Sequence, residues 1–554
     1  MAHDAADVLV RRGVAVPMRD GVVLRADVWA PADGRPRPAL LQRTPYDRTH
    51  LDDVVGTMGL DPLRAADAGF ATVVQDVRGR YGSEGSFEPY VQELDDGEDT
   101  VAWVAAQPFC DGRVAMYGVS YGGSSQLLAA VRAPAALAAI APSIAGAEFW
   151  EGRSYQGGAL HLGFLAYWTV EALAPDGVAR LARRDPAAAR RIAATLERFA
   201  DEPDAPLRMR PAELVEPLHP VAPYLRDWFG HPWRDAYWQA TSIRDRYAQV
   251  AVPALHVGGW HDSFIGGTLA NYVGMRAHAA TPAAREGQRL VVGPWAHGTW
   301  SEIQGERHFG AHSSRAWLDS TRMNLEFFAA VLRGEAPPGP PVRLFVMGAD
   351  RWRDEDEWPL RRARTVAWHL RPDGALDPAP PPSEARPSAI AHDPADPVPT
   401  VAGATILPDG KAMLRSGARD RRAVQARADV LVFESAPLEE PLEITGPLAA
   451  EIWIVPDRAG ADVVVALSEV MADGRAMHVA DGVVRLPAGG GATAPVRVEV
   501  DLLATSLALV PGQRLRVEVC GSCAPRFDVH PQRPARHLLL HDAAHPSRVL
   551  LPIA

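Results

Sequence analysis

The hexapeptide GVSYGG at 118–123 contains the pattern G-x-S-x-G around Ser120. In enzymes with this pattern the serine stands on a sharp, strained turn between a strand and a helix, and the flanking glycines leave room for that turn. Here the apolar run RVAMYGV precedes the serine, and a stretch rich in alanine and leucine follows it. Because both flanks suit a strand–turn–helix unit, we predict that Ser120 is a nucleophile for acyl transfer.

A serine hydroxyl is a weak nucleophile unless a base accepts its proton, and a carboxylate then orients that base. With a serine turn of this kind, the acid and the histidine follow the serine in that order, at the ends of later strands. Asp262 follows the apolar run at 254–260, and His297 follows the one at 289–295. We therefore predict Asp262 as the acid and His297 as the base. Three other histidines in the region are alternatives for the base: His261, His308 and His312.

Acyl transfer also needs two hydrogen-bond donors for the oxyanion that forms on the substrate carbonyl. The backbone N–H of Tyr121, directly after the serine, is the first candidate. The second donor should lie in the loop after an early strand, which reads RTPYDR at 43–48 and lacks the glycines that would present a backbone donor. Tyr46 offers a phenolic O–H in their place. A packing role for Tyr46 is the alternative.

The elements that must position these residues alternate between strand-like and helical patterns. Strand-like runs lie at 13–30 (as a hairpin), 39–46, 71–77, 113–119, 254–260 and 289–295. Helical spacing occurs at 61–68, at 93–106 and directly after Ser120, and once more between the last two strand-like runs. Such alternation predicts a largely parallel sheet with helices on both faces, which is the α/β class.

From about 146 to 245 the strand signal disappears, and the segment is rich in tryptophan and in helical runs. We interpret it as a helical cap inserted between two strands of the sheet. The alternative is that these helices belong to the layers of the sheet itself. Nearly a hundred residues without strand–helix alternation favour the cap.

After about 340 short strands recur with turn signals between them, which is typical of an antiparallel sandwich or jelly roll. The proline-rich stretch at 371–400 is interpreted as a long loop of this domain. The predicted organisation is an α/β domain in two parts, a cap and a β domain, covering residues 1–145, 146–245, 246–340 and 341–554 in turn.

Composition narrows the classes of function. The 554 residues carry a formal net charge of −11 and no dense basic run, which argues against nucleic acid as a partner. No run approaches 18 apolar residues and no signal peptide precedes the first strand, so we expect no membrane partner and a cytoplasmic protein. Three cysteines fit a reducing compartment, and the lone pair Cys520 and Cys523 is too little for a zinc site. We expect no metal and no cofactor.

Several spaced motifs resemble those of the cocaine esterase / X-Pro dipeptidyl-peptidase (CocE/NonD) family of serine hydrolases. They cover essentially the whole chain in the order of the family: RTPYDR (43–48), QDVRGRYGSEGSF (75–87), GVSYGG (118–123), GGWHDSF (258–264), GPWAHG (293–298) and DPADPVPT (393–400). The resemblance implies an α/β-hydrolase domain, an inserted helical cap and a C-terminal jelly-roll domain. It also implies a triad of Ser120, Asp262 and His297, with Tyr46 as the side-chain donor to the oxyanion.

The resemblance further narrows the substrate. The α-amino acid ester hydrolases of this family place acidic residues shortly after the catalytic aspartate, whereas this chain has Phe264 and Ile265 there. Phe264 looks like an aromatic residue of the acyl pocket, and Trp168 in the cap is similar to a pocket tryptophan, with packing within the cap as its alternative. An aryl or apolar acyl group is therefore favoured.

The expected function is hydrolysis of a small-molecule carboxylic ester, and assembly as a homodimer is left open. One alternative is an X-Pro dipeptidyl-peptidase or another amide hydrolase, which would need an anionic anchor for the free α-amine of the peptide. The cap supplies four acidic candidates for that anchor: Glu148, Glu151, Asp201 and Glu202. The other alternative is a ligand-binding protein on an inactive hydrolase fold, and an intact triad argues against it.

Overall fold

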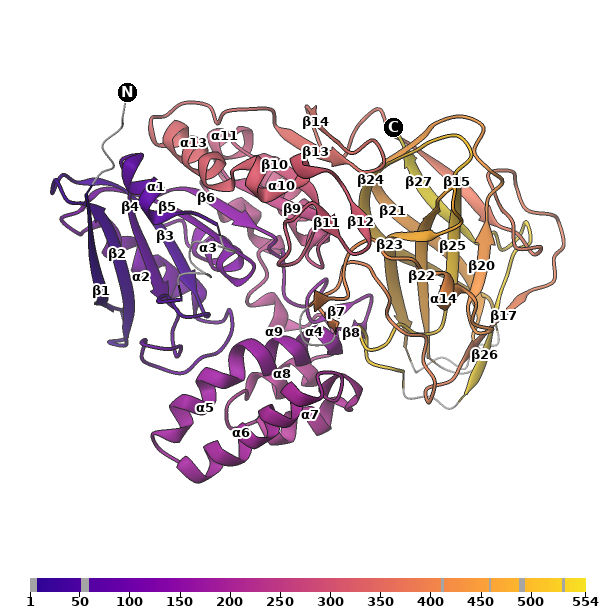
Figure 1. Cartoon of the computed structure of the whole chain (residues 1–554), viewed down its shortest axis with the longest axis horizontal. Helices are drawn as coiled ribbons and strands as arrows, with labels where there is room; N and C mark the ends of the chain where they lie inside the picture. The colour runs from indigo at the N-terminus through magenta and orange to yellow at the C-terminus, as the bar shows by residue number, and fades with distance from the viewer. Residues whose placement is uncertain (1–6, 51–58, 410–412, 458–459, 488–493, 531–533) are drawn as a thin grey trace.

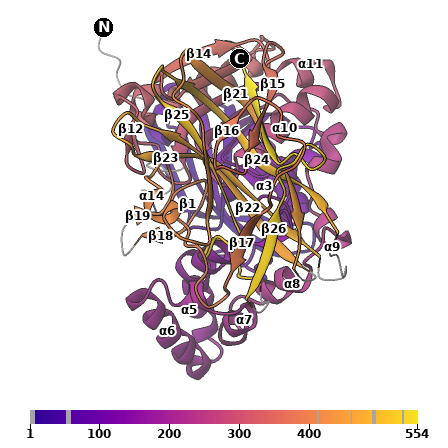
Figure 2. The ribbon, with the colours of Figure 1, turned by 90° about the vertical axis from the view of Figure 1, so that its right-hand side faces the viewer.

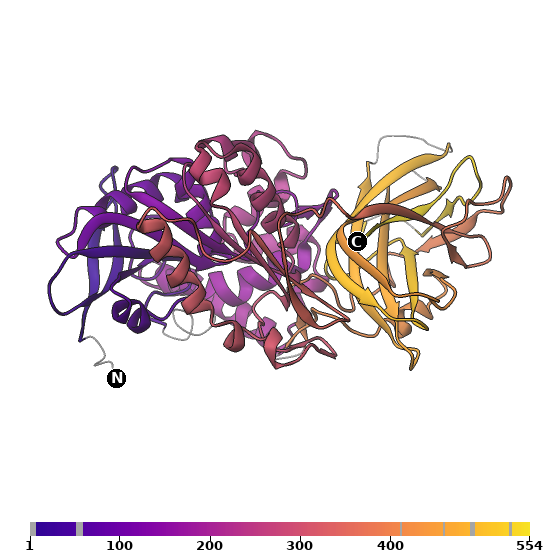
Figure 3. The same ribbon diagram turned by 90° about the horizontal axis from the view of Figure 1, so that it is seen from above.

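The computed structural model describes residues 7–50, 59–409, 413–457, 460–487, 494–530 and 534–554. Figure 1 shows a mixed sheet with flanking helices in the first part of the chain, a group of helices beside it, and a β domain formed by the last third. Seen from above, the β domain lies at one end of an elongated molecule (Figure 3). The chain thus has an α/β-hydrolase fold with a helical insert and a C-terminal antiparallel β domain.

The first sheet has ten strands in the order β1-β2-β4-β3-β5-β6-β9-β10-β13-β14. Its central strands are parallel, while β1, β2 and β14 join it in antiparallel pairings. The strands are β1 (Val8–Pro17), β2 (Val23–Pro31), β3 (Arg37–Thr44), β4 (Ala71–Asp76), β5 (Cys110–Val119), β6 (Leu137–Ser143), β9 (Leu255–His261), β10 (Arg289–Ala296), β13 (Val342–Val346) and β14 (Arg351–Glu355).

Helices cover both faces of this sheet. Side chains alternate along each strand, so apolar residues on either face need a layer of helices to bury them. On β5, Met116 packs in the cluster that holds Leu127 of α3, whereas Tyr117 packs in the one that holds Phe327 and Phe328 of α13. The helices and small elements of this domain are α1 (Pro62–Asp67), α2 (Glu93–Ala105), α3 (Tyr121–Val131), α10 (Ile265–His278), α11 (Pro282–Glu286), β11 (Ile303–Gln304), β12 (Arg307–His308), η5 (Ala311–Ser313), α12 (Arg315–Leu318) and α13 (Ser320–Leu332).

The insert lies between β6 and β9, as the loss of strand signal predicts, and is almost entirely helical. It also contains a short hairpin, with two residues in each strand, that the sequence does not reveal, and a π-helical turn. Its elements are β7 (Tyr155–Gln156), β8 (Ala159–Leu160), α4 (Leu162–Tyr167), the π-helix η2 (Trp168–Leu173), α5 (Ala174–Ala182), α6 (Pro186–Asp201), η3 (Pro206–Arg208), α7 (Pro211–Leu218), α8 (Tyr224–Gly230), α9 (Ala236–Gln239) and η4 (Arg244–Gln249).

The C-terminal domain contains a seven-stranded and a four-stranded sheet whose strands all pair antiparallel. This domain faces the viewer in Figure 2. The residues between the sheets form one apolar cluster. Its elements are β15 (Arg364–Leu370), β16 (Leu376–Asp377), β17 (Ser388–His392), β18 (Pro408–Asp409), β19 (Met413–Leu414), α14 (Arg422–Gln425), β20 (Leu431–Glu434), β21 (Leu442–Val455), β22 (Ala461–Val470), β23 (Ala476–Leu486), β24 (Val496–Leu509), β25 (Arg514–Cys520), β26 (Ala535–Leu539) and β27 (Arg548–Ile553).

Three features differ from the sequence-based expectations. The strand at 342–346, expected in the β domain, pairs parallel with β10 and so extends the first sheet together with β14. Strand β6 escaped notice because its sequence, LAAIAPS, is rich in alanine and has a single β-branched residue, Ile140, of the kind that marks a buried strand. The stretch at 371–400 stays in the β domain but carries β16 and β17, so it is not simply a loop.

Candidate active site

Ser120 lies on a tight turn between β5 and α3 with φ 57° and ψ −116°. This backbone region is strained for a residue with a side chain, so the surroundings must hold it there. The Ser120 N–H donates to the Ser143 carbonyl at 2.9 Å, which ties the turn to β6. A Cβ on Gly123 would lie 2.9 Å from the same carbonyl oxygen, so glycine is required where α3 passes β6.

Asp262 and His297 directly follow the neighbouring parallel strands β9 and β10, whose register aligns His261 with Ala296. The next residue of each strand therefore lies at the same edge of the sheet. His297 Nδ1 is 2.7 Å from Asp262 Oδ1, and His297 Nε2 is 3.0 Å from Ser120 Oγ. The structure thus brings the three residues together in one hydrogen-bonded chain. Asp262 is completely buried and Ser120 is half-buried.

The three other histidines of this region have different surroundings. His261 is buried, with its ring 6.5 Å from the rings of Phe309 and of His478 in the β domain. Burial lowers the pKa of His261 to about 3. His308 is exposed, and His312 Nε2 bonds the Asp350 carbonyl at 2.6 Å. Of the four histidines considered, His297 is the one that bonds Ser120.

Tyr46 lies beside the serine and lines the same pocket. Its hydroxyl oxygen accepts a hydrogen bond from Trp168 Nε1 at 3.0 Å. Burial raises the pKa of the Tyr46 phenol, and contacts with Trp168 and Ser120 partly oppose that shift. The phenol therefore keeps its proton at neutral pH and remains able to donate it in a hydrogen bond.

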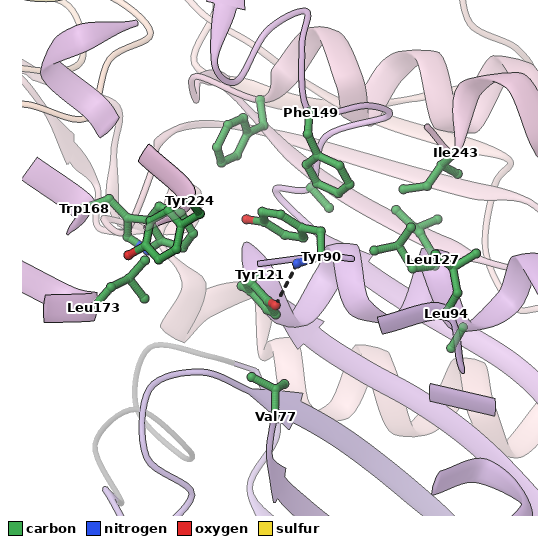
Figure 4. Packing of buried hydrophobic residues seen from close by; sticks show 14 of the residues in the cluster. Val77, Tyr90, Leu94, Tyr121, Leu127, Phe149, Trp168, Leu173, Tyr224 and Ile243 are labelled. Carbon is green, nitrogen blue, oxygen red and sulfur yellow. Dashed lines mark hydrogen bonds between the residues drawn. The ribbon is translucent and has the colours of Figure 1, made fainter. Parts of the chain in front are cut away.

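Tyr121 is the first residue of α3, where backbone N–H groups have no partner within the helix. Its own side chain is buried and fixed beneath the turn. The Tyr121 hydroxyl donates to Glu93 Oε1 at 2.8 Å and accepts from the Tyr90 N–H at 3.1 Å, the bond dashed in Figure 4. Glu93 in turn pairs with the buried Arg43, and burial raises the pKa of the Glu93 carboxyl.

This network anchors Tyr121, whose N–H is the predicted backbone donor to the oxyanion. Removing one partner of a buried ion pair typically lowers the free energy of unfolding by about 3–5 kcal/mol, because the other charge is left buried without compensation. The structure therefore holds Arg43, Glu93 and Tyr121 in this arrangement. The Tyr90 ring adds to it by stacking between Tyr121 and Phe149, with centroid separations of 4.4 and 3.9 Å (Figure 4).

Above Ser120 lies a cavity of about 630 Å³ to which all three parts of the fold contribute. The cap supplies Phe164, Tyr167 and Trp168, and the β domain supplies Ile406. These side chains make much of the wall apolar, which is typical of small-molecule sites. Two charged residues, Glu171 and Arg419, also line the cavity.

The two predicted pocket residues lie differently. Trp168 lines the cavity, whereas Phe264 is buried and is not among the described residues of the lining. Phe264 packs edge-on against the His297 ring at 5.1 Å and against Phe164 at 5.7 Å. Phe264 thus packs against the base, His297, and against the wall residue Phe164, on the side away from the cavity lining.

Sequence reasoning missed most of the wall. Phe164 stands four residues before Trp168, so helical spacing could have placed both on one face. Ile406 and Arg419 come from the β domain, more than a hundred residues after His297, and no local signal links them to the site.

Within the described ranges, no group of three or more His, Cys, Asp or Glu side chains is arranged to hold a metal ion. The cysteines Cys110, Cys520 and Cys523 are buried and form no disulfide with one another. Nor does any helix in that part of the chain have the length and apolar character needed to span a membrane.

Comparison with known proteins gives matches over nearly the whole chain. Residues 20–299 match the family model for X-Pro dipeptidyl-peptidase (S15 family), and 337–550 match that for the X-Pro dipeptidyl-peptidase C-terminal non-catalytic domain. The cocaine esterase of Rhodococcus sp. (strain MB1 Bresler) is 35% identical, covering 98% of each chain. A Mycobacterium bovis protein named as a serine esterase is 27% identical over 97% of this chain and 94% of its own.

Two solved structures share the fold. An aminopeptidase from a Thaumarchaeota archaeon is 24% identical, covers 99% of this chain and 97% of its own, and superposes with a TM-score of 0.82. An α-amino acid ester hydrolase, also 24% identical, covers 100% of this chain and 98% of its own with a TM-score of 0.78. Because one is an aminopeptidase and the other an ester hydrolase, the shared fold does not distinguish between peptide and ester substrates.

Replacing the serine tests its role as nucleophile. We expect Ser120→Ala to lower kcat by about 10⁶-fold, since removing the nucleophile of a Ser–His–Asp triad costs about as much as removing the whole triad. Steady-state turnover of a p-nitrophenyl ester measures the loss. Ser124→Ala, which removes a buried hydroxyl one turn further along α3, is the matched control and should retain activity. Unchanged turnover in Ser120→Ala would refute the assignment.

Removing the Tyr46 hydroxyl tests the oxyanion site. Tyr46→Phe should reduce kcat by about 10²–10³-fold, because one oxyanion donor is lost while the ring remains. The KM for a small ester should change little, since the interaction strengthens only as charge develops on the carbonyl oxygen. A loss of less than tenfold in kcat would leave Tyr46 as a packing residue.

Proposed function

The chain belongs to the CocE/NonD family of serine hydrolases, and on that premise we propose that it is a carboxylic ester hydrolase. The reaction proceeds through an acyl-enzyme on Ser120, with an apolar or aryl acyl group favoured. The observation that carries the proposal is the continuous chain of hydrogen bonds from Ser120 Oγ through His297 to Asp262, which opens into a cavity with aromatic walls.

In the first half of the reaction, Ser120 Oγ attacks the ester carbonyl carbon while His297 Nε2 accepts the hydroxyl proton. Asp262 accepts the hydrogen bond from Nδ1–H and stabilises the imidazolium. The carbonyl oxygen becomes an oxyanion that receives hydrogen bonds from the Tyr46 hydroxyl and the Tyr121 N–H. When the tetrahedral intermediate collapses, the C–O bond to the alcohol breaks and His297 gives its proton to the departing alcohol oxygen.

The second half repeats these steps with water. The water oxygen attacks the acyl carbon while His297 accepts a proton from the water. The Tyr46 hydroxyl and the Tyr121 N–H again donate to the oxyanion that forms. The intermediate releases Ser120, which recovers its proton from His297, and the carboxylic acid leaves. No group other than the described side chains and the Tyr121 backbone is needed.

The walls of the cavity favour an apolar acyl group. Phe164, Trp168 and Ile406 offer apolar surface next to the serine, and Ile265 stands buried where an amino-acid ester hydrolase would carry an acid. The similarity to a cocaine esterase and to a protein named as a serine esterase supports an ester substrate. Apolar pockets discriminate by only about 1–3 kcal/mol per methylene, so several esters should be accepted.

A peptidase that releases X-Pro dipeptides is the second candidate, because it would use the same triad. It requires a carboxylate near the serine to hold the α-ammonium of the peptide. The acids considered from the sequence do not line the cavity within the described part of the chain: Glu148 pairs with Arg234, Glu151 accepts from the Gly157 N–H, and Asp201 and Glu202 are exposed at the end of α6.

Glu171 is a candidate to hold a peptide α-ammonium, because this exposed cap residue does line the cavity. It lies in the π-helix that begins at Trp168. The non-catalytic alternative has less support, since Ser120, His297 and Asp262 are hydrogen-bonded in an order suited to proton transfer.

A comparison of two chromogenic substrates separates the candidates. We expect kcat/KM for p-nitrophenyl benzoate to exceed that for an X-Pro-p-nitroanilide by at least about tenfold, or 1.4 kcal/mol. Glu171→Gln should leave ester turnover within about threefold, and so should Glu197→Gln, an exposed cap carboxylate outside the cavity lining. Faster anilide cleavage that Glu171→Gln alone abolishes would overturn the esterase assignment in favour of the peptidase.

A further inference from the structure

The bond between Trp168 and Tyr46 has a consequence for the proposed oxyanion site. A phenol oxygen can accept and donate, and its O–H can rotate about the C–O bond. Because the oxygen of Tyr46 accepts the Trp168 indole N–H at 3.0 Å, the Tyr46 proton must point elsewhere. The same hydroxyl also interacts with the Ser120 side chain, so its O–H faces the serine, where the substrate carbonyl must bind.

One buried arginine connects the two segments that carry these residues. Arg80 is 2% exposed and donates three hydrogen bonds to backbone carbonyls: from Nε to Pro45 at 2.9 Å, and from its two terminal nitrogens to Leu173 at 2.7 Å and Ala172 at 3.0 Å. Pro45 directly precedes Tyr46, and the other two carbonyls end the π-helix that begins at Trp168. The rigid planar guanidinium thus joins the loop of Tyr46 to the cap turn of Trp168.

The indole ring is also held from its faces. It stacks on Trp228 with an interplanar angle of 8° and a centroid separation of 5.9 Å, and on Phe164 at 14° and 5.8 Å. The buried guanidinium of Arg153 lies 5.0 Å from the indole centroid. A cation over an indole face is stabilising and draws electron density from the ring, which strengthens the N–H as a donor.

The turn itself departs from ordinary helical geometry. Residues 168–173 form a π-helix between α4 and α5, and π-helical turns occur frequently at functional sites. Tyr46 and Trp168 come from different domains, so their bond forms only where the cap and the sheet meet.

We propose that Trp168 is a positioning residue that directs the Tyr46 O–H toward the oxyanion, and that Arg80 holds the two residues in register. This inference rests on the proposed function, in which Tyr46 is an oxyanion donor. It gives the indole N–H a task in every acyl transfer at this site, whatever the acyl group. A tryptophan that only lines the acyl pocket would instead matter according to the size of the acyl group.

A double-mutant cycle separates the two roles. The variants are Trp168→Phe, Tyr46→Phe and the double variant, each assayed with p-nitrophenyl acetate and p-nitrophenyl benzoate. We expect Trp168→Phe to lower kcat about tenfold for both esters while the KM for the acetate changes less than about threefold. In the Tyr46→Phe background the same substitution should change kcat by less than about twofold, because the residue through which it acts is gone.

The matched control is Trp238→Phe, which removes another buried cap indole whose N–H donates to the His231 carbonyl at 2.8 Å. It should leave kcat within about twofold. Losses from Trp168→Phe that multiply with those of Tyr46→Phe, or that appear only with the benzoate, would overturn the inference and leave the ester hydrolase proposal intact. If Tyr46→Phe alone cost less than tenfold, the Tyr46 assignment would fail, and this inference with it.

Arg80→Gln tests the clamp. It should lower kcat in the wild-type background about as much as Trp168→Phe does and have little further effect in Tyr46→Phe. Arg180→Gln is its control, since Arg180 also bonds three carbonyls, those of Tyr81, Ser83 and Gly85, but reaches neither Pro45 nor the π-helix. Equal kcat losses in the two arginine variants would contradict a specific role for Arg80. Should Arg80→Gln fail to fold, the cycle with Trp168 decides alone.

Discussion

The site depends on a backbone constraint at one residue, the positive φ of Ser120 between β5 and α3. A conformation of this kind costs of order 1–3 kcal/mol and persists only where the surrounding structure determines it. The Ser143 carbonyl, the close passage of Gly123 over β6 and the anchored Tyr121 side chain supply that determination. Because the central strands are parallel, their carboxyl ends bring the acid and the base to the edge at which this turn exposes the serine hydroxyl.

Buried guanidinium groups recur around this turn, and their sets of partners differ. Arg43 pairs with the carboxylate of Glu93. Arg80 bonds three carbonyls between the Tyr46 loop and the cap and also lies 3.6 Å from a carboxylate oxygen of Asp176. Arg153 lies among aromatic rings, including that of Trp168 in the pocket wall. A buried charge is tolerated only when such partners compensate for lost hydration. The cap is therefore joined to the sheet by directional polar contacts as well as by apolar packing, which suits a site that needs precise placement of donors.

The part of the site that follows from strand ends could be predicted from the sequence. Ser120, Asp262 and His297 stand where apolar runs stop, and the order of these runs places their ends at one edge of the sheet. The alternation of strands and helices, the helical insert and the β-rich C-terminal region likewise indicated the fold. Trp168, predicted from the sequence, does line the pocket. The rest of the wall could not be predicted in this way, because Ile406 reaches it through contacts between domains, and Phe264 is turned inward against the base. The bond from Trp168 to Tyr46 depends on how the cap sits on the sheet, which no local pattern encodes.

The central claim is that a carbonyl oxygen on Ser120 is held between the Tyr46 hydroxyl and the Tyr121 N–H. A crystal structure of the enzyme after reaction with a p-nitrophenyl alkylphosphonate tests it most directly, since the phosphonyl group mimics the tetrahedral intermediate. The account predicts phosphorus bonded to Ser120 Oγ, with one phosphonyl oxygen about 2.7–3.1 Å from both Tyr46 Oη and the Tyr121 nitrogen. A phosphonyl oxygen directed away from both donors, or an adduct on a residue other than Ser120, would contradict it.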